Sequence, residues 1–223
     1  LAARGSSVAA SARSADKLAE LAAASGNIRA KPVDVTVRED VRRVHGEIVS
    51  EIGPIDLAIL NAGVWHPMAA SGLDAGKAAE SMSVNYLGIV NALEPLIPAM
   101  TERRRGQIAL VASVAGYRGL PKAAAYAPTK AAVISLAEVL RLELSRHGIV
   151  VSLVNPGFVE TPMTAVNKFP MPYIIRADDA ADRILRGLER GRFEIAFPWQ
   201  LVTLLKVLRM LPNALYLRIA SRL

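Results

Sequence analysis

Residues 107–113 are Gln-Ile-Ala-Leu-Val-Ala-Ser, a continuous apolar run that ends on a serine. A short apolar run of this kind is typical of a strand that is buried on both faces, as in a parallel sheet. Open α/β sheets bind their ligands beyond the carboxyl ends of the strands. We therefore expect Ser113, which ends the run, to face a binding cleft.

The rest of the chain alternates between similar strands and amphipathic segments, which predicts an α/β domain with a doubly wound parallel sheet. We expect the segment 75–100 to be mostly helical and interrupted or bent near Pro95 and Pro98, because proline disrupts a helix interior. The other predicted helices are 15–24, 37–52, 125–146 and 178–189, and the predicted strands are 6–12, 28–33, 55–60, 108–112, 149–155 and 193–197. They make up one domain over residues 1–197.

The composition narrows the function classes. The net charge is +7, but no basic stripe is interleaved with aromatic residues, so we expect no nucleic-acid partner. Cysteine is absent, which excludes disulfides and thiolate nucleophiles and fits a reducing, cytoplasmic compartment. The histidines His45, His66 and His147 are isolated from acidic partners at metal-binding spacing, and we predict no metal site.

Tyr126 and Lys130 stand four residues apart near the start of a predicted helix, so they share one of its faces. A phenol has a pKa of about 10, and lowering it to roughly 7 needs about 4 kcal/mol of preferential phenolate stabilisation. An exposed helical ion pair contributes only ~0.2–0.5 kcal/mol, so the pair must lie in a partly dehydrated pocket. Ser113 would then hold a carbonyl or alcohol oxygen while Tyr126 exchanges the proton.

Several short segments of the chain form an ordered set of possible site motifs. They are Asp34-Val35, Asn61-Ala62-Gly63, Asn85 in Ser-Val-Asn-Tyr, the set Ser113, Tyr126 and Lys130, and Asn155-Pro156-Gly157 followed by Thr161. In this order and spacing they resemble the short-chain dehydrogenase/reductase family, whose nucleotide-binding fold is Rossmann-like. The resemblance covers residues 1–197.

The resemblance implies a catalytic role for four residues. Tyr126 would donate the proton in reduction and accept it in oxidation, and Lys130 would lower the pKa of Tyr126 and bind the nicotinamide ribose. Ser113 would orient the substrate oxygen, and Asn85 would hold a water of the proton relay. The hydride itself would come from the cofactor.

The resemblance also implies how a dinucleotide is bound. Asp34 and Val35 would contact the adenine, and Asn61, Ala62 and Gly63 would lie beside the cofactor. Pro156, Gly157 and Thr161 would flank the nicotinamide carboxamide. The long helices around 87–100 and 131–144 would form a contact between subunits, so we expect a homo-oligomer.

Cofactor choice depends on Ser11-Ala12-Arg13. Enzymes that prefer NAD usually carry an acid at the end of this strand to bind the ribose hydroxyls. Ala12 stands where that acid is expected, and Arg13 follows it. A cation without an acid suits a 2′-phosphate, so we predict NADP(H) in preference to NAD(H).

The chain departs from the family pattern at its beginning. The first strand and the glycine-rich turn of the family are lacking, and Leu1-Ala2-Ala3-Arg4-Gly5 resembles the last turn of a helix and its glycine stop. The lacking strand would be central, between strands 6–12 and 55–60. We therefore expect the sequence to be a piece of a longer protein.

Residues 198–223 form an apolar and basic extension for which the family gives little guidance. We expect its first part to be a helix with one apolar stripe, formed by Leu201, Leu204, Leu205, Leu208 and Leu211. It is too short to span a membrane. Three interpretations stay open: packing on the substrate pocket or a partner subunit, a peripheral contact with a membrane surface, or a simple part of the core.

We predict an NADP(H)-dependent oxidoreductase that interconverts an alcohol and a ketone on a small hydrophobic substrate. The hydrophobic character follows from residues 161–175, which we expect to cover the substrate and which are rich in apolar side chains. The alternative is a catalytically silent nucleotide-binding or scaffold protein of the same fold.

Overall fold

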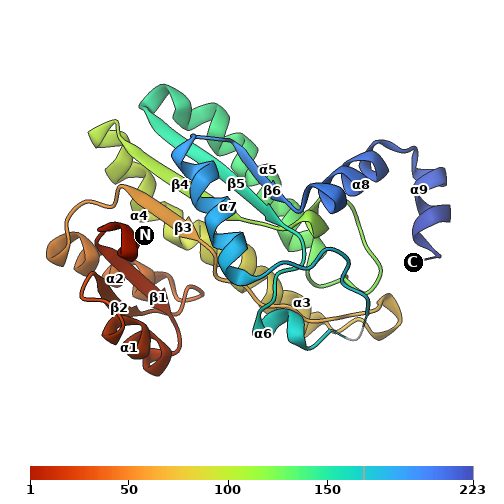
Figure 1. The fold of residues 1–223 in the computed structure, drawn as a ribbon, viewed down its shortest axis with the longest axis horizontal. Coiled ribbons are helices and arrows are strands. Elements are labelled where there is room, and N and C mark those ends of the chain that lie inside the picture. The colour runs from red at the N-terminus through yellow and green to blue at the C-terminus, as the bar shows by residue number, and fades with distance from the viewer. Residues whose placement is uncertain (168, 223) are drawn as a thin grey trace.

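The computed structural model describes residues 1–167 and 169–222 as strands and helices in alternation (Figure 1). Most segments form where the hydrophobic pattern predicts them. The strands are β1 (Val8–Ala12), β2 (Ile28–Pro32), β3 (Leu57–Leu60), β4 (Gly106–Val111), β5 (Ile149–Pro156) and β6 (Glu194–Phe197). The helices are α1 (Ala15–Ala23), α2 (Arg38–Glu51), α3 (Ala75–Met82), α4 (Gly88–Arg103), α5 (Ala127–Leu144), α6 (Pro162–Ala165), α7 (Ala177–Glu189), α8 (Trp199–Met210) and α9 (Asn213–Ala220).

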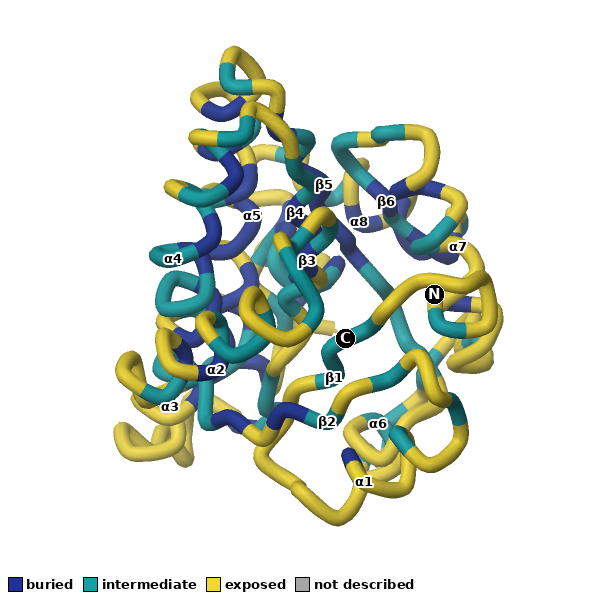
Figure 2. Tube along the Cα trace, turned by 90° about the vertical axis from the view of Figure 1, so that its left-hand side faces the viewer, coloured by how far each residue is buried: buried dark blue, intermediate teal, exposed yellow. Residues whose placement is uncertain are grey.

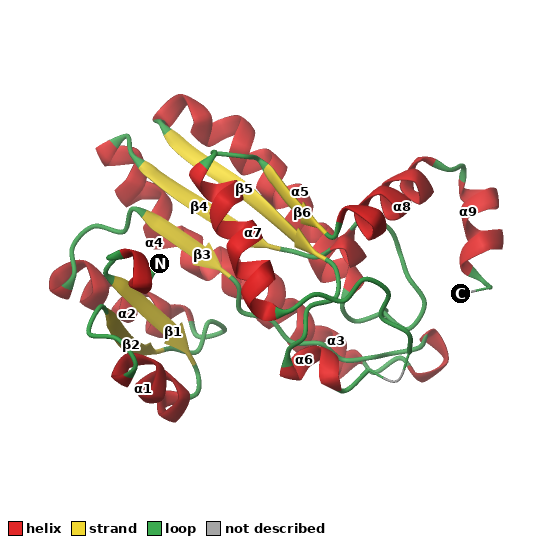
Figure 3. Cartoon of the chain, viewed as in Figure 1, coloured by secondary structure: helices red, strands yellow, loops and turns green. Residues whose placement is uncertain are grey.

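All strand pairs in the described residues are parallel, which confirms the predicted α/β class. The strands form two sheets, one of β1 and β2 and one in the order β3-β4-β5-β6 (Figure 3). The division between β1 and β3 falls at the place predicted from the family pattern. The expectation of a preceding strand stays a prediction.

The core lies on both faces of the four-stranded sheet. Side chains along β4 alternate between the faces, as the two-residue period of a strand requires. Ile108 and Leu110 pack with α4 and α5, whereas Ala109 and Val111 pack with α7. The darkest segments of Figure 2 follow β4, β5 and the inner side of α5. This rigid centre holds the carboxyl ends of β4 and β5 in place.

The predicted helix 75–100 is interrupted, but at a different place from the one we expected. A π-helical turn, Ser83–Leu87, separates α3 from α4, while Pro95 and Pro98 both lie inside α4. The prediction of an interruption near the prolines was therefore wrong, while the alternative of a bend there stays a prediction. π-turns occur frequently at functional sites, and this one carries Asn85.

The small sheet is joined to the main body through α2. Val33, Val41 and Val44 form an apolar cluster between β2 and α2, and Arg38 and Arg42 on α2 both pair with Glu94 on α4. The exposed ion pairs contribute little energy, so packing of α2 on α4 is the main attachment.

The C-terminal helices extend from one end of the molecule (Figure 1). Leu201, Val202 and Leu205 of α8 belong to the same apolar core as β4 and β5. Leu204 of the predicted apolar stripe is 53% exposed, so the core covers only part of that stripe. The contact surface is rotated toward Val202 because α8 packs on the turn at Gly157. In the part of the chain that the structure describes, no helix is long and apolar enough to cross a bilayer.

Candidate active site

Tyr126 and Lys130 lie at the beginning of α5, beside the carboxyl end of β4. Tyr126 is the N-cap residue, and Pro128 occupies the first turn, where its lack of an N–H group costs no hydrogen bond. Thr129 and Lys130 point inward and are almost fully buried, at 1% and 3% exposure. The helix start therefore directs a hydroxyl and an amine into the interior beside the phenol.

Asn85 connects three segments of the chain. Its Oδ1 accepts a hydrogen bond from the N–H of Val64 at 2.7 Å, and its Nδ2 donates to the Val64 carbonyl at 3.1 Å. The same Nδ2 donates to Thr129 Oγ1 at 3.1 Å, and Thr129 donates to the Tyr126 carbonyl at 2.8 Å. This network ties the π-turn, the segment after β3 and the start of α5 to one another.

Lys130 reaches across to the end of β4. Its Nζ donates to the Val111 carbonyl at 2.9 Å and lies 5.5 Å from the centre of the Tyr126 ring. A Cβ at Gly63 would lie 3.7 Å from this Nζ and 3.3 Å from Asn85 Oδ1, so glycine allows the backbone to approach both groups. Gly116 is needed for a similar reason, because a Cβ there would lie 2.7 Å from the backbone carbon of Lys130.

Burial controls the pKa values of both central groups. Burial raises the pKa of Tyr126 to about 12, and the hydrogen bond with Ser113 opposes this rise only in part. Burial also lowers the pKa of Lys130 to about 8. We expected Lys130 to make the phenol more acidic, but within the protein alone dehydration dominates, because the ammonium is directed to a backbone carbonyl.

Ser113 lies just beyond the carboxyl end of β4, as predicted. Its Oγ accepts a hydrogen bond from the Ala115 N–H at 3.1 Å and donates to the Pro156 carbonyl at 3.4 Å. The Ser113 side chain is also close enough to Tyr126 to oppose part of the rise in the pKa of the phenol. The structure therefore brings Ser113, Tyr126, Lys130 and Asn85 into one cluster.

Two side chains that sequence reasoning did not select complete this cluster. Trp65 packs edge-on against Tyr126, with ring centres 5.0 Å apart, and Thr129 links Asn85 to Tyr126. Thr129 stands inside the Tyr126-to-Lys130 spacing, so its position offered a signal. For Trp65 the sequence contains none, because its contact depends on the path of the segment after β3.

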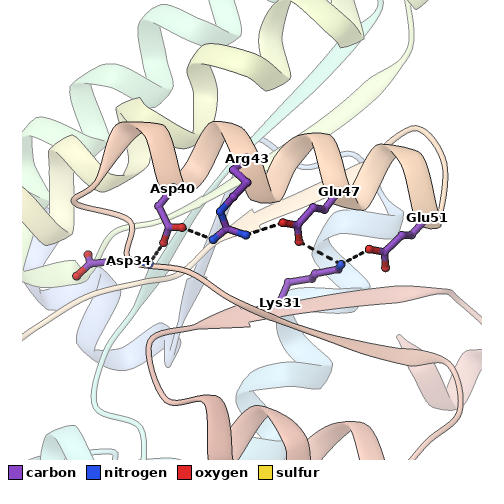
Figure 4. A network of polar contacts seen from close by, with 6 residues as sticks. All are labelled: Lys31, Asp34, Asp40, Arg43, Glu47 and Glu51. Carbon is purple, nitrogen blue, oxygen red and sulfur yellow. Dashed lines mark hydrogen bonds and ion pairs between the residues drawn. The ribbon is translucent and has the colours of Figure 1, made fainter.

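The opposite end of the site is formed by the carboxyl ends of β1 and β2. Arg13 is exposed and close enough to Asp34 to help lower its pKa, although hydrogen bonds from Thr36 are the larger cause. A ladder of charges links Lys31, Asp40, Arg43, Glu47 and Glu51, and the Asp34 N–H joins it by donating to Asp40 at 2.9 Å (Figure 4). The ladder orients the turn that carries Asp34.

Val35 does not lie free beside Asp34. Its side chain packs so closely on α4 that a Cβ at Gly88 would come within 2.7 Å of it, and its carbonyl accepts a hydrogen bond from Asn91 at 2.8 Å. Asn61 and Ala62, in contrast, are exposed at the end of β3. The candidate cofactor residues thus divide into exposed groups and groups that also hold the fold together.

The remaining predicted residues follow β5. Gly157 packs against α8, since a Cβ there would lie 2.8 Å from Leu201 and 3.0 Å from Pro198. Thr161 is exposed and caps the short helix α6 through a capping box with Thr164. Asn167 accepts a hydrogen bond from the Trp65 ring N–H at 2.9 Å, so the segment after Thr161 folds back over the site.

These groups fit a dinucleotide. Arg13, Gly63 and Gly157 follow the carboxyl ends of parallel strands, where such ligands bind, and Lys130 of α5 reaches the end of β4 through its Nζ. Because Gly63 has no side chain, the space beside the Asn85 amide and the Lys130 ammonium stays open. His66, by comparison, pairs with Glu80 at 3.0 Å, and in the described residues no cluster of metal-binding side chains is found.

Comparisons with known proteins agree with this geometry. The family model described as short chain dehydrogenase matches residues 1–169. An uncharacterised oxidoreductase of Myxococcus xanthus is 35% identical over 92% of this chain and 81% of its own length. A 3-oxoacyl-[acyl-carrier-protein] reductase of Thermotoga maritima is 32% identical over 75% of this chain and 65% of its own length.

Solved structures have the same fold. A short-chain dehydrogenase of Sphingobium yanoikuyae, determined in complex with NADPH, superposes with a TM-score of 0.79 at 26% identity. The match covers 87% of this chain and 79% of that protein. From the family match, the relatives and the parallel sheet together, the chain belongs to the short-chain dehydrogenase family of oxidoreductases.

Proposed function

We propose that this chain reduces a hydrophobic carbonyl compound to an alcohol with NADPH, and catalyses the reverse reaction less readily. The observation that carries this proposal is the cluster of half-buried Ser113 and Tyr126 with buried Lys130 and Asn85 at the carboxyl end of β4. When bound, the cofactor supplies the hydride. The protein supplies the position of the carbonyl oxygen and the proton.

The raised pKa of Tyr126 supports the reductive direction. A phenol with a pKa of about 12 stays protonated at neutral pH, so it can donate a proton to a developing alkoxide. Ser113 would donate a second hydrogen bond to the same oxygen. Lys130, with a pKa of about 8, would keep its positive charge at neutral pH and hold that charge near the phenol ring.

NADP(H) is the cofactor we propose. Arg13 lies exposed at the end of β1, and Ala12 before it provides no carboxylate to bind ribose hydroxyls. The relative from Sphingobium yanoikuyae was determined in complex with NADPH. Asp34, Val35, Asn61, Ala62, Gly63, Pro156, Gly157 and Thr161 are proposed as the other cofactor contacts.

A hydrophobic substrate is supported by the lining next to the cluster. A cavity of about 420 Å³ is bordered by Met68, by the segment 119–124, and by Ala127 and Pro128 beside Tyr126. Most of this lining is apolar. The relative from Thermotoga maritima is named for a 3-oxoacyl substrate, a carbonyl on an acyl chain.

Residues 198–223 are proposed as a helical extension of the domain with a peripheral membrane contact. Trp199, Val207 and Met210 are 70%, 53% and 84% exposed on α8. The extension contains basic but no acidic side chains, and such a surface suits anionic lipid headgroups. A homo-oligomer is proposed through α5, where Leu142 is 78% exposed.

The experiment follows absorbance of the reduced nicotinamide with a panel of short and long-chain ketones, 3-oxoacyl thioesters and steroids. We expect NADPH consumption that depends on an apolar chain, and loss of about 10²–10⁴-fold in kcat for Tyr126→Phe, which removes the general acid. Arg105→Ala is the control and should retain activity, because Arg105 precedes β4, is exposed and pairs with exposed Asp56.

A silent nucleotide-binding protein is the second candidate. The observation in its favour is that Lys130 donates to Val111 and does not lower the pKa of Tyr126. Tight NADPH binding without turnover of any member of the panel would favour this candidate over the reductase.

A further inference from the structure

Three consecutive residues fasten the loop between Ser113 and Tyr126 to the C-terminal part of the chain. They are Tyr117, Arg118 and Gly119, which follow the 3₁₀ turn Val114–Gly116. None of them belongs to the cluster described above. Their partners lie about 75 to 100 residues later in the chain, on β6, α8 and α9.

Arg118 holds the junction between the last two helices. Its Nη1 donates to the carbonyl oxygens of Leu208, Arg209 and Leu211 at 2.9, 2.9 and 2.8 Å. The last carbonyls of a helix lack partners inside the helix, and a cation there also suits the helix dipole. One guanidinium therefore caps the end of α8.

The same side chain also holds the beginning of α9. Nη2 of Arg118 donates to Asn213 Oδ1 at 2.7 Å, and its guanidinium carbon lies 3.9 Å from the centre of the Tyr216 ring. Tyr216, only 4% exposed, returns a hydrogen bond from its hydroxyl to the Gly119 carbonyl. The loop and α9 are thus connected in both directions.

Tyr117 makes a second attachment, through Glu194 on β6. Its hydroxyl donates to Glu194 Oε1 at 2.5 Å, and Asn155 Nδ2 donates to the same oxygen at 3.0 Å. Lys206 on α8 forms an ion pair with the other carboxylate oxygen. Burial is the largest effect on Glu194 and raises its pKa, but the hydrogen bonds from Lys206, Tyr117 and Asn155 together lower it.

The other side of this loop touches the reactive cluster. Gly116 lies against the backbone of Lys130, and Ser113 bonds Pro156, the residue after Asn155. The loop is therefore held between α5 on its inner side and the C-terminal helices on its outer side. If Arg118 or Glu194 moved, the loop would move with it, and few contacts separate that part of the loop from Ser113.

We propose that Arg118 and Glu194 are positioning residues for the reaction: by fixing residues 117–119 to β6, α8 and α9, they set the placement of Ser113 and Tyr126. The inference rests on the proposed reductase function, which it deepens. It assigns the C-terminal helices a part in catalysis, as the outer support of the loop that carries the proton donor.

The test compares Arg118→Ala, Arg118→Lys and Glu194→Gln with the full-length wild type. Arg105→Ala is the matched control, since Arg105 precedes β4, is exposed and pairs with exposed Asp56. Four quantities are measured: kcat and KM with a turned-over ketone, the Kd of NADPH from nicotinamide fluorescence, and hydrogen–deuterium exchange of peptides covering 113–126, 199–216 and β5.

We expect Arg118→Ala to speed exchange in 113–126 as well as in 199–216, with β5 unchanged. Its kcat should fall on the order of 10- to 100-fold, because small misplacements of reacting groups are costly. The Kd of NADPH should stay within about twofold, because no cofactor contact is removed. Arg118→Lys keeps the charge but not the planar fork and should recover only part of kcat.

Glu194→Gln keeps an acceptor for Tyr117 but loses the ion pair, so its effects should have the same pattern and be smaller. Faster exchange confined to 199–216 with unchanged kcat would overturn the proposal. A uniform increase that includes β5 would also overturn it, because it would indicate general destabilisation. If the wild type turns over no ketone, the reductase function fails, whereas the exchange pattern still decides whether the loop depends on Arg118 and Glu194.

Discussion

At the scale of single residues, the site is governed by dehydration. The pKa of Tyr126 is raised to about 12 and that of Lys130 is lowered to about 8, and burial is the main cause of both shifts. Burial always disfavours the charged form, so it keeps the phenol protonated and makes the ammonium easier to deprotonate. As a result, the phenol of Tyr126 stays protonated and the amine of Lys130 stays charged at neutral pH.

This pair of shifts predicts the pH dependence of the reductive reaction. Below pH 8 Lys130 is charged and Tyr126 is protonated, so both groups are in their active forms. As the pH rises through about 8, Lys130 loses its charge, and kcat should decline although Tyr126 remains protonated. The check is a pH profile of kcat for wild type and Lys130→Arg, whose residual activity should lack this decline. A wild-type profile that stays flat well above pH 8 would contradict the assignment.

Arg13 is the residue at which cofactor choice can be tested. A charge-assisted hydrogen bond to a 2′-phosphate contributes about 1.5–3 kcal/mol, so Arg13→Ala should weaken NADPH binding about 10- to 100-fold. NADH binding should change little. Kd values from fluorescence titration decide this, with the exposed Arg29→Ala as the control. Equal binding of NADH and NADPH by the wild type would remove the preference.

At the scale of elements, glycines determine how closely the segments of the site approach one another. Gly116 faces the backbone of Lys130, and an added Cβ would lie 2.7 and 2.8 Å from the carbonyl carbon and oxygen of that residue. Backbone atoms cannot turn aside as a flexible side chain would. The 3₁₀ turn and α5 can therefore pack this closely only with glycine at this position.

Replacing Gly116 by alanine should consequently separate these two elements. Overpacking of this kind costs typically ~1–3 kcal/mol of unfolding free energy. Activity should fall as well, because Lys130 would shift. Gly26→Ala, in an exposed turn before β2, is the control, since nothing lies within 4 Å of its added Cβ. Urea denaturation and kcat of the two variants provide the comparison, and equal stability would disprove the steric explanation.

At the scale of the whole molecule, the surface of α8 predicts an interaction with anionic membranes. Val207 and Met210 are exposed on a helix flanked by Lys206 and Arg209. Replacing both apolar residues by glutamine should reduce co-sedimentation with vesicles that contain anionic lipid, while binding to purely zwitterionic vesicles is weak from the start. Identical sedimentation of wild type and the double variant would dismiss the membrane contact. The kcat and KM of the double variant in buffer without vesicles or detergent should equal those of the wild type.

Subunit contact through α5 is a separate prediction at this scale. Leu142 is 78% exposed and Val139 is 45% exposed on the outer side of α5. If this face is an interface, Leu142→Glu should shift the mass in light scattering toward the monomer without altering the unfolding midpoint of the monomer. The exposed Arg146→Glu serves as a control for charge alone. An unchanged oligomer in Leu142→Glu would place the interface elsewhere.

The local sequence pattern was sufficient to predict most helices and strands. It failed where contacts between distant parts of the chain determine the structure. The strand at 108–112 and the helix after Tyr126 were predicted because apolar spacing and the proline signal are local. The π-turn at Asn85 was missed, because it depends on bonds to Val64 and Thr129, which lie 21 and 44 residues away. The sequence did not predict which leucines of the stripe are buried, because the orientation of α8 depends on its packing against Gly157.

The amino-acid sequence alone determined the fold class, the order of strands and helices, and the identities of Ser113, Tyr126, Lys130 and Asn85 as members of one site. Ser113, Tyr126 and Lys130 follow from spacing and residue chemistry, which are properties of the chain itself, whereas Asn85 was included because of the family resemblance. Only the tertiary structure decided that Lys130 binds the Val111 carbonyl, that dehydration raises the pKa of Tyr126, and that Arg118 joins the loop to α8 and α9. The reason is physical: burial and long-range hydrogen bonds depend on which segments meet in space, and distance along the chain does not specify that.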